Sequence, residues 1–254
     1  MKINFLGTGT SQGIPIIGSK DPVCLSENIK DKRLRTSVWI EWDGTSFVVD
    51  CGPDFRQQML RSGCTKIDAL LMTHEHADHS AGLDDIRPYV FRQGALPIFG
   101  LKRVIDNLSR RFDYIFSDKN KYPGAPSVKP VVIDPKQDFI AAGKTITPIT
   151  VQHYGLAVLG YRFENFAYIT DMFSIDDTQK SKLIGIDVLV VNALRIKPHP
   201  SHLHLDAAID FAQEIKAKKT YFTHISHKLG FHQEVSKSLP DNIHLAYDTL
   251  EITV

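Results

Sequence analysis

The feature that most constrains this sequence is a run of histidine and aspartate residues in its first half. Four side chains that can bind a metal, those of His74, His76, Asp78 and His79, stand within six residues. A helix cannot present residues at this spacing to one point, so we expect an irregular loop. Apolar residues 70–72 predict a strand before the loop, and the residues after Gly82 predict a helix. The alternative interpretation is a histidine-rich loop that faces solvent.

The second half of the chain repeats one arrangement three times. Short β-favouring runs end in His153, in Asp171 and in His224. Each of these residues alone is more often structural than functional. Because all three follow expected strands, as the loop in the first half does, we interpret them together as parts of one metal site. Asp50 also ends an expected strand, and we interpret it as a support for the metal loop rather than as a ligand.

The run that begins at His74 resembles a known signature. His-x-His-x-Asp-His, followed by a small residue and Gly82, is similar to the motif of the metallo-β-lactamase fold hydrolases. The resemblance implies an α/β fold (α+β in some schemes), namely a four-layer αβ/βα sandwich, in a single domain over residues 1–254. It also implies that metals lie at strand ends between two sheets.

The resemblance further implies a binuclear metal centre. In that superfamily three histidines hold one divalent ion, an aspartate and two histidines hold the other, and a second aspartate bridges both. The matching residues are His74, His76 and His153 for the first ion, Asp78, His79 and His224 for the second, and Asp171 as the bridge. Imidazoles and carboxylates without thiolates suit zinc or manganese, and iron is a further candidate.

The N-terminal segment is most similar to one branch of this superfamily. Its run Leu-Gly-Thr-Gly at residues 6–9 resembles the opening of the phosphoribosyl 1,2-cyclic phosphate phosphodiesterases. In that branch a cysteine cluster after this loop and a distant histidine hold a structural zinc ion. Here residues 19–21 contain no cysteine, and only Cys24 and His227 match, with Asp21 as a third candidate ligand. Structural zinc sites usually have four protein ligands, so we expect this one to be incomplete.

A histidine-rich loop in the second half indicates the type of reaction. Apolar residues 188–191 predict a strand that leads to this loop and then to a helix. In the phosphodiesterase and tRNA-processing branches a histidine just before this helix is a general acid, and the resemblance assigns that role to His202. His199 and His204 are lesser candidates. We expect His202, together with the ligand Asp78, to be catalytic, because an alkoxide leaving group requires protonation.

The charge of the expected centre favours phosphate esters. Two divalent ions carry four positive charges, and the two carboxylates return only two. We therefore expect a metal-dependent phosphodiesterase, in which hydroxide attacks phosphorus and a histidine protonates the departing oxygen. The expected substrate is a small anionic phosphodiester, such as a cyclic nucleotide-like or phosphoribosyl cyclic phosphate. The alternatives are a tRNA 3′-end processing endonuclease, a thioesterase or lactamase of the same fold, and a metal-binding protein without activity.

Composition bears on partners and compartment. A formal net charge of +1 argues against a nucleic-acid partner. The opening apolar run is too short for a signal peptide, no membrane span is expected, and the three cysteines form no CxxC pair. These features predict a cytoplasmic location. A homodimer is considered only because related enzymes often associate.

The remaining segments carry weaker expectations. The glycine loop at residues 7–13 and three arginines are hypothesised to seat the non-reacting part of an anionic substrate. These arginines are Arg33, Arg35 and Arg56. Residues 83–92 predict a helix, and residues 244–254 predict one strand. Residues 113–130 have no clean period and favour a plain surface loop over a lid.

Overall fold

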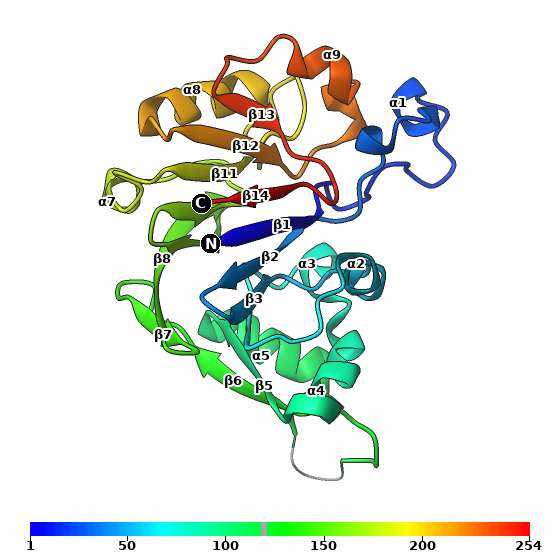
Figure 1. Ribbon diagram of the computed structural model, residues 1–254, viewed down its shortest axis with the longest axis vertical. Coiled ribbons are helices and arrows are strands. Elements are labelled where there is room, and N and C mark those ends of the chain that lie inside the picture. The colour runs from blue at the N-terminus through cyan, green and yellow to red at the C-terminus, as the bar shows by residue number, and fades with distance from the viewer. Residues whose placement is uncertain (118–120) are drawn as a thin grey trace.

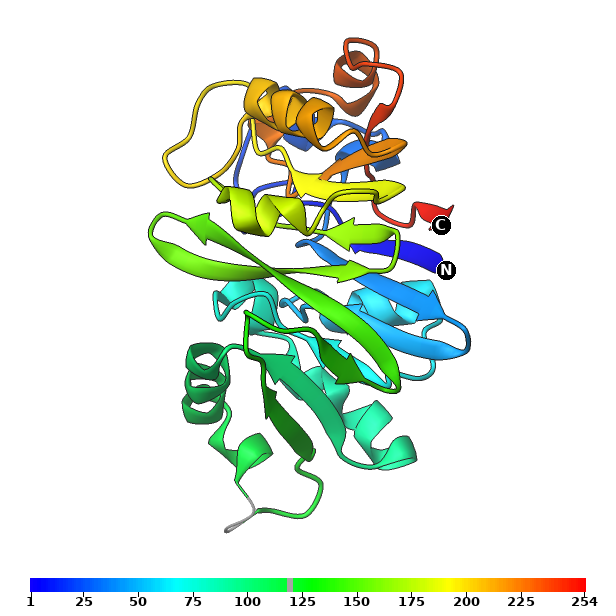
Figure 2. The same cartoon turned by 90° about the vertical axis from the view of Figure 1, so that its left-hand side faces the viewer.

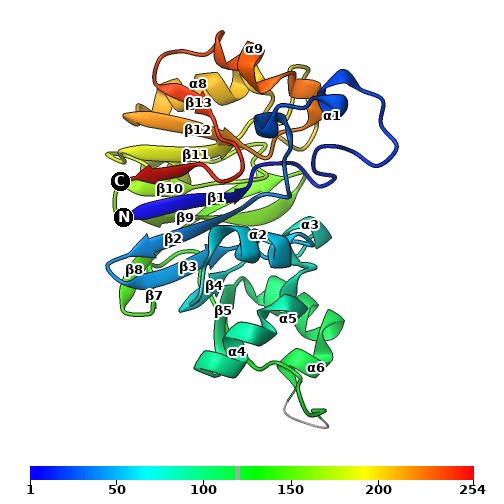
Figure 3. The same ribbon diagram turned by 45° about the vertical axis from the view of Figure 1, so that its right-hand side comes forward.

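The computed structural model describes residues 1–117 and 121–254. Two seven-stranded sheets pack face to face, and helices cover the outer face of each sheet (Figures 1 and 3). The layers therefore follow the order helix, sheet, sheet, helix. The prediction of a four-layer αβ/βα sandwich is confirmed.

The first sheet has the strand order β14-β1-β2-β3-β4-β5-β6. Its strands are β1 (Lys2–Gly7), β2 (Ser37–Trp42), β3 (Thr45–Val49), β4 (Ala69–Leu71), β5 (Leu96–Gly100), β6 (Val128–Val132) and β14 (Glu251–Thr253). Alternation sets the faces of β2: Val38 and Ile40 point to the second sheet, whereas Trp39 packs on the helix side. Strands β3 to β6 run parallel, so their carboxyl ends meet at one edge.

The second sheet has the strand order β13-β12-β11-β10-β9-β8-β7. Its strands are β7 (Phe139–Ala141), β8 (Lys144–His153), β9 (Leu156–Phe163), β10 (Phe166–Tyr168), β11 (Val188–Asn192), β12 (Lys219–Thr223) and β13 (Ile243–Leu245). Strands β10 to β13 run parallel. Strand β11 is buried along its whole length, as its unbroken apolar sequence predicts for a parallel strand covered on both faces.

Helices flank both sheets. They are α1 (Pro22–Leu25), α2 (Phe55–Ser62), α3 (Ala77–Ser80), α4 (Arg87–Gln93), α5 (Lys102–Arg111), α6 (Asp113–Phe116), α7 (Asp177–Ser181), α8 (Leu205–Ile215) and α9 (His232–Ser236), with 3₁₀ turns η1 (Ile29–Asp31), η2 (Leu83–Ile86) and η3 (His227–Leu229). Helix α2 ends where the sequence predicts, because Gly63 takes up the left-handed conformation that terminates it, at φ 70°.

Aromatic side chains from both sheets form the central core. The Phe47 and Phe163 rings lie 5.8 Å apart between their centroids, and so do the Phe5 and Tyr221 rings. Separate apolar clusters join each sheet to its own helices. At one end of the sandwich the terminal amine of Met1 donates a hydrogen bond to the carbonyl of Val254 (2.8 Å), so the two ends of the chain lie side by side (Figure 1).

Two elements differ from the sequence prediction. The helix expected over residues 83–92 is the 3₁₀ turn η2 followed by α4, because a proline near the first turn of α4 starts a new helix. The single strand expected over residues 244–254 was wrong. Strands β13 and β14 belong to opposite sheets, and between them the buried Asp248 carboxylate accepts hydrogen bonds from Thr8 and from the backbone N–H of Leu34. These bonds hold the chain where it crosses from one sheet to the other.

The segment 113–130 contains more regular structure than a plain loop, since α6 begins it and β6 starts near its end. Its residues 118–120 lie outside the described residues. Tyr122 and the carbonyl of Gly124 accept hydrogen bonds from Arg87 on α4, and Lys121 bonds to the last part of α6. The described part of the segment thus packs on neighbouring helices, and none of these contacts supports a lid.

Candidate metal centre

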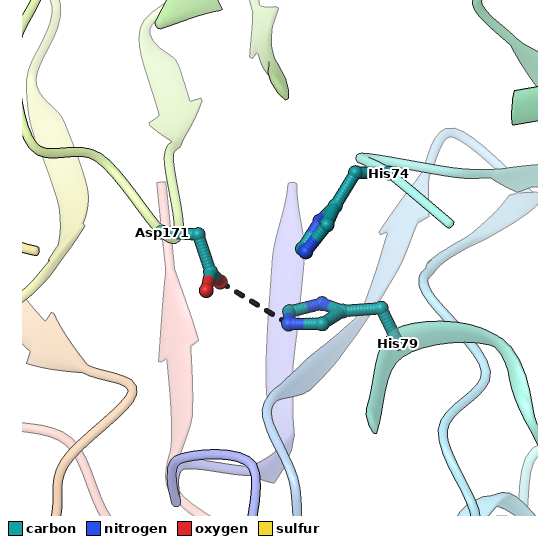
Figure 4. Close-up of side chains that lie close together, drawn as sticks. All are labelled: His74, His79 and Asp171. Atoms are coloured by element: carbon teal, nitrogen blue, oxygen red, sulfur yellow. Dashed lines mark ion pairs between the residues drawn. The ribbon is translucent and has the colours of Figure 1, made fainter. Parts of the chain in front are cut away.

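The ligands expected from the sequence gather at the edge where parallel strands of both sheets end. His74 follows β4, Asp171 follows β10 and His224 follows β12, while His153 is the last residue of β8. Figure 4 shows His74 and His79 side by side, with the carboxylate of Asp171 turned toward them from the other sheet. Crevices beyond the carboxyl ends of strands are where open α/β sheets place ligands.

The loop that carries the first four expected ligands is held by the hydroxyl of Ser80 and by close packing at Gly82. Ser80 donates a hydrogen bond from its hydroxyl to the carbonyls of Glu75 (3.1 Å) and His76 (2.8 Å). A side chain at Gly82 would place its Cβ 2.1 Å from the carbonyl oxygen of Gly52, so this position requires glycine. Glycine at the end of the motif therefore allows the loop to pack closely on the segment after β3.

The Asp50 side chain holds the same loop in position. Its carboxylate is fully buried and accepts hydrogen bonds from the backbone N–H and the hydroxyl of Thr73, both at 2.8 Å. It also contacts Nδ1 of His79 at 2.7 Å. These bonds fix the His79 ring and direct its Nε2 toward the other ligands. Asp50 is thus placed as a support, as the sequence interpretation expected.

Three histidines form one side of the centre. The Nε2 atom of His74 lies 2.9 Å from Nδ1 of His76. The His153 ring lies 5.9 Å from the His74 ring and 5.4 Å from the His76 ring, between centroids. His153 donates from Nδ1 to the carbonyl oxygen of Ser201 at 2.9 Å, which leaves Nε2 free to bind a cation.

Two carboxylates and two histidines form the other side. The Nε2 atom of His79 lies 3.1 Å from Asp171 Oδ2 and 3.4 Å from Asp78 Oδ2. The Nε2 atom of His224 lies 3.3 Å from Asp171 Oδ1 and 3.8 Å from Asp78 Oδ2. The two oxygens of Asp171 thus face different histidines, which is the orientation that a bridging carboxylate needs.

The backbone is strained at three of these positions. Asp50, Asp171 and His224 have φ values of 63°, 57° and 54°, in the left-handed region that residues other than glycine rarely adopt. Each of the three follows a strand of the parallel part of its sheet. Such conformations cost about 1–3 kcal/mol each and cluster at functional sites. The sequence carried no signal of this strain.

Several ring nitrogens of the centre make no hydrogen bond within the protein. Both ring nitrogens of His224 and Nδ1 of His202 are buried without one, and Nε2 of His79 faces the carboxylates of Asp78 and Asp171 without forming one. Leaving a buried polar atom unpaired costs about 1–3 kcal/mol unless another group satisfies it. Three groups of three side chains bring ligand atoms within 4.8 Å of one another. They are His74, His79 and Asp171; Asp78, His79 and His224; and His153, Asp171 and His202. The residues therefore fit divalent cations, while the number of ions and their division among the ligands stay predictions.

Protonation of the centre follows from burial and charge. Burial lowers the pKa of His74 well below its usual value, so its ring is neutral, as a ligand must be. Burial also disfavours the charged form of His79, but Asp171, Asp78 and Asp50 raise its pKa well above the usual value. The proton on His79 thus supplies positive charge among three carboxylates. A cation bound there would displace this proton.

Of the three loop histidines, His202 lies nearest the ligands. Its ring centroid is 4.6 Å from that of His153 and 4.9 Å from that of His224, and its Nδ1 lies 3.7 Å from Asp171 Oδ1. His199 lies beyond it, with 5.2 Å between the ring centroids of the two. His204 is the N-cap residue of α8.

The candidate ligands of the structural zinc site make other contacts, and whether they bind zinc stays a prediction. Asp21 accepts a hydrogen bond from the backbone N–H of Val23 and caps α1, while Cys24 packs against Val23 and Ile14. In the part of the chain that the structure describes, every group of three or more metal-binding side chains belongs to the centre above. His227 is in none of these groups.

The arginine hypothesis was wrong for Arg33. Its side chain is buried, and its guanidinium donates to the hydroxyl of Thr8 (2.7 Å), the carbonyl of Ala246 (2.6 Å) and Nδ1 of His232 (3.1 Å). Arg35 forms an ion pair with Asp54 at 3.1 Å. Arg56 is exposed on α2, and its role stays a prediction.

Four backbone amides of the glycine loop are already bonded within the protein. The backbone N–H of Thr8 donates to Asp248, that of Gly9 to Leu34, that of Thr10 to Ile225 and that of Gly13 to Thr10. A Cβ at Gly7 would lie 2.0 Å from the carbonyl oxygen of Arg35. The glycines therefore allow close packing of backbone segments, and the phosphate-cradle hypothesis is wrong for these four amides.

Sequence reasoning missed several residues around the centre. Asn192 braces the segment after Asp171, since its side-chain amide exchanges two hydrogen bonds with the backbone of Met172 at 2.7 and 2.9 Å. A polar residue at the end of an apolar strand was the available signal. Tyr154 and Ser201 line a cavity beside the metal ligands, and nothing in the sequence pattern connects the two.

Comparison with known proteins agrees with this geometry. Residues 45–225 match the family model described as a beta-lactamase superfamily domain. The chain belongs to the metallo-β-lactamase superfamily. The predicted resemblance is confirmed, and with it the expectation of a hydrolase of this fold.

Three metallo-β-lactamase relatives are informative. A solved structure described as a new diphosphatase from the PhnP family is 40% identical, covers 100% of this chain and 97% of its own, and has a TM-score of 0.92. An octanoyltransferase of Porphyromonas gingivalis is 40% identical over 256 residues, which are 100% of this chain and 52% of that protein. A ribonuclease Z of Methanopyrus kandleri is 34% identical over 83 residues, 32% of this chain and 24% of that protein. The chain thus spans about half the length of the octanoyltransferase.

Among residues 1–117 and 121–254, no helix has the length and apolar character needed to span a bilayer.

Proposed function

We propose that this chain hydrolyses small phosphate compounds in which phosphorus carries two bridging oxygens, either a small phosphodiester or a diester of diphosphate, rather than a polynucleotide. The single observation that carries the proposal is the position of His202. Its ring lies between those of His153 and His224, but His202 is not among the seven residues expected to hold metal. An imidazole in this place can deliver a proton to a leaving oxygen. The relatedness to a PhnP-family diphosphatase adds support.

The ligand set fits chemistry at phosphorus. His74, His76, His153, Asp78, His79, Asp171 and His224 would hold two divalent ions. When bound, such ions stabilise negative charge on phosphoryl oxygens and lower the pKa of water. The carboxylates of Asp78, Asp171 and Asp50 offset three of their four positive charges, so the centre remains positive and attracts anions. Asp50 and Ser201 keep two of the imidazoles oriented.

His202 is assigned the role of general acid. Burial and the neighbouring His224 lower the pKa of His202 to about 3 in the free protein, although Asp171 acts in the opposite direction. The ring is therefore neutral before substrate binds. A phosphate anion bound beside it raises the pKa of an imidazole, so the proton is taken up together with the substrate. Transfer of that proton to the departing oxygen completes the reaction.

Both substrate types present the same reacting group to these residues. In a phosphodiester and in a diester of diphosphate, the attacked phosphorus carries one negative charge and a leaving oxygen opposite the incoming nucleophile. A phosphate monoester leaving from a diphosphate requires less protonation than an alkoxide does, because it is a better leaving group. Removal of His202 should therefore slow hydrolysis of an alkyl phosphodiester more than hydrolysis of a diester of diphosphate.

A panel of substrates tests the proposal. The zinc- or manganese-loaded protein should hydrolyse adenosine 2′,3′-cyclic phosphate or diadenosine diphosphate, with the metal-free protein as control. Precursor tRNA and an octanoyl thioester complete the panel. Turnover of the tRNA or the thioester alone would contradict the proposal.

Hydrolysis of an acyl thioester is the second candidate. It is favoured by the likeness to the octanoyltransferase and by the apolar walls of the cavity beside His76 and His153. Acyl transfer through a cysteine is not supported, because all three cysteines are buried. Burial also raises the pKa of the Cys51 thiol far above its usual value, which suppresses the nucleophilic thiolate. A thioesterase of this kind would have to use the metal centre.

A further inference from the structure

An exposed tyrosine stands at the tip of the hairpin that carries the ligand His153. Strand β8 ends at His153, β9 begins at Leu156, and the two pair directly, so Tyr154 and Gly155 form a two-residue turn. Their φ values are 47° and 79°. Two consecutive positive values define the turn type that favours Asn-Gly or Asp-Gly. A bulky residue in the first of these positions is strained.

Another hairpin of the chain shows what this turn ordinarily contains. Asp43 and Gly44 connect β2 to β3 with φ values of 46° and 76°. Aspartate tolerates this backbone conformation because its short side chain can bond locally. Tyrosine has no such compensation. Tyrosine at residue 154 therefore departs from the residue preference of this turn.

The Tyr154 side chain makes no compensating contact within the protein. It is 77% exposed, and in the described part of the chain it has neither a hydrogen-bond partner nor an aromatic neighbour. The ring also lines a cavity beside His76 and His153, where an aromatic side chain can contact a bound molecule. The β8–β9 hairpin and the loop after β11 project from the same edge of the molecule (Figure 2).

A cavity lies between these two projections. It has a volume of about 410 Å³ and is lined by His76, His153, Tyr154, Leu156, Pro200 and Ser201. This volume is within the range of small-molecule sites. The imidazoles of His76 and His153, which belong to the metal centre, line one part of the cavity, and Tyr154 lines another. A molecule whose phosphate is held at the metal centre can therefore extend over Tyr154. No acidic, lysine or arginine side chain lines it, so the rest of that molecule meets a largely apolar surface.

We propose that Tyr154 is a stacking platform for the base of a nucleotide substrate. The proposal rests on the proposed function and narrows it to phosphate esters that carry a nucleobase. A base stacked on an exposed ring buries one face and keeps its polar edges in water. An acyl chain packed on the same ring would leave much of its own apolar surface in solvent, because the Tyr154 ring is itself exposed. The geometry thus favours a base over a chain.

The proposed stacking can be tested by comparing the binding of two phosphates of which one carries a base and the other does not. This comparison requires no turnover. Calorimetry should show that the zinc-loaded protein binds AMP on the order of tenfold more tightly than ribose 5-phosphate, the value of one stacked base. Tyr154→Ala should remove this preference by weakening AMP alone. Tyr154→Phe, which retains the ring, should retain the preference. Octyl phosphate should bind no better than ribose 5-phosphate.

Two control variants separate stacking from folding. Tyr154→Asn supplies the residue that the turn favours, so we expect a higher melting temperature together with loss of the AMP preference. Ala142 occupies the same position in the turn between β7 and β8, with φ 48°. Ala142→Asn should likewise raise the melting temperature and leave AMP binding unchanged.

Three results would overturn the proposal: equal affinity of the wild-type protein for AMP and ribose 5-phosphate, an AMP preference that survives Tyr154→Ala, or octyl phosphate binding as tightly as AMP. The proposed function fails separately, through absence of metal-dependent turnover of both phosphate diesters in the substrate panel. The binding result and the turnover result can therefore be told apart.

Discussion

The glycine loop at residues 7–13 and the metal loop at residues 73–82 differ in one physical respect. In the glycine loop, four amides and the neighbouring Arg33 are bonded within the protein. In the metal loop, Nε2 of His79 is buried and without a hydrogen bond. Both segments look like binding sites in the sequence. Buried ring nitrogens without a hydrogen bond accompany the metal loop, whereas the four amides of the glycine loop have partners, so the metal loop fits a ligand and these four amides do not.

The largest effect is expected from Asp171→Ala. Removing the carboxylate that faces both His79 and His224 should release metal and lower activity by more than the roughly 10⁴-fold upper range for loss of a general acid. Metal content of the purified variant, measured by atomic emission, checks the cause. Retention of two ions would show that Asp171 does not bridge them.

His202→Ala should slow hydrolysis of an alkyl phosphodiester by about 10²–10⁴-fold while leaving the metal content unchanged. A nitrophenyl diester is the control, because its phenolate departs with little protonation and should lose much less rate. An equal loss on both substrates would mean that His202 positions substrate or binds metal, as its proximity to Asp171 and His153 would allow. A selective loss in His204→Ala instead would transfer the role to His204.

Arg33→Met tests whether the arginine beside the glycine loop stabilises the fold rather than binds substrate. Burial lowers the pKa of Arg33 to about 10, so the side chain remains charged at neutral pH, with Asp248 and Asp31 acting to keep it so. Its loss leaves buried partners unpaired and should lower the free energy of unfolding by about 3–5 kcal/mol. Denaturant titration measures this. A raised KM at unchanged stability would instead restore the substrate-binding hypothesis, and the exposed Arg56→Met provides the comparison.

The smallest effect is expected from Asp50→Asn. The amide can still accept from Thr73, but it orients His79 less firmly, so metal affinity should fall by about 10–100-fold. Competition with a chelator measures the change. Asp54→Asn is the matched control, because that carboxylate pairs with Arg35 rather than with a ligand. Equal losses in both variants would contradict a specific role for Asp50.

Much of the centre was predictable because its signal is local. The spacing of His74 to His79, and the β-favouring runs before His153, Asp171 and His224, depend only on neighbours in the sequence. The role of Arg33 was not predictable, since its partners Ala246 and His232 lie more than 190 residues away along the chain. Burial of an arginine by distant segments leaves no periodic pattern.

The division of the C-terminal segment into β13 and β14 was not predictable for the same reason. Propensity over residues 244–254 favours one extended run, but Asp248 binds Thr8 and Leu34 from the opposite end of the chain. Tyr154 was missed because its turn violates the residue preference on which the prediction of hairpins depends. Local rules fail where a distant contact sets the conformation or where a turn holds an atypical residue.

The distribution of the ligands over both sheets has a mechanical consequence. His74, His76, Asp78 and His79 come from the first sheet, whereas His153, Asp171 and His224 come from the second. Any cation shared between them is a cross-link that fastens the open edge of the sandwich. At a free concentration about 1,000 times its dissociation constant, such a cross-link contributes about 4 kcal/mol to the folded state. Chelation would then allow the sheets to part at this edge first, with hydrogen exchange fastest where β4, β10 and β12 end.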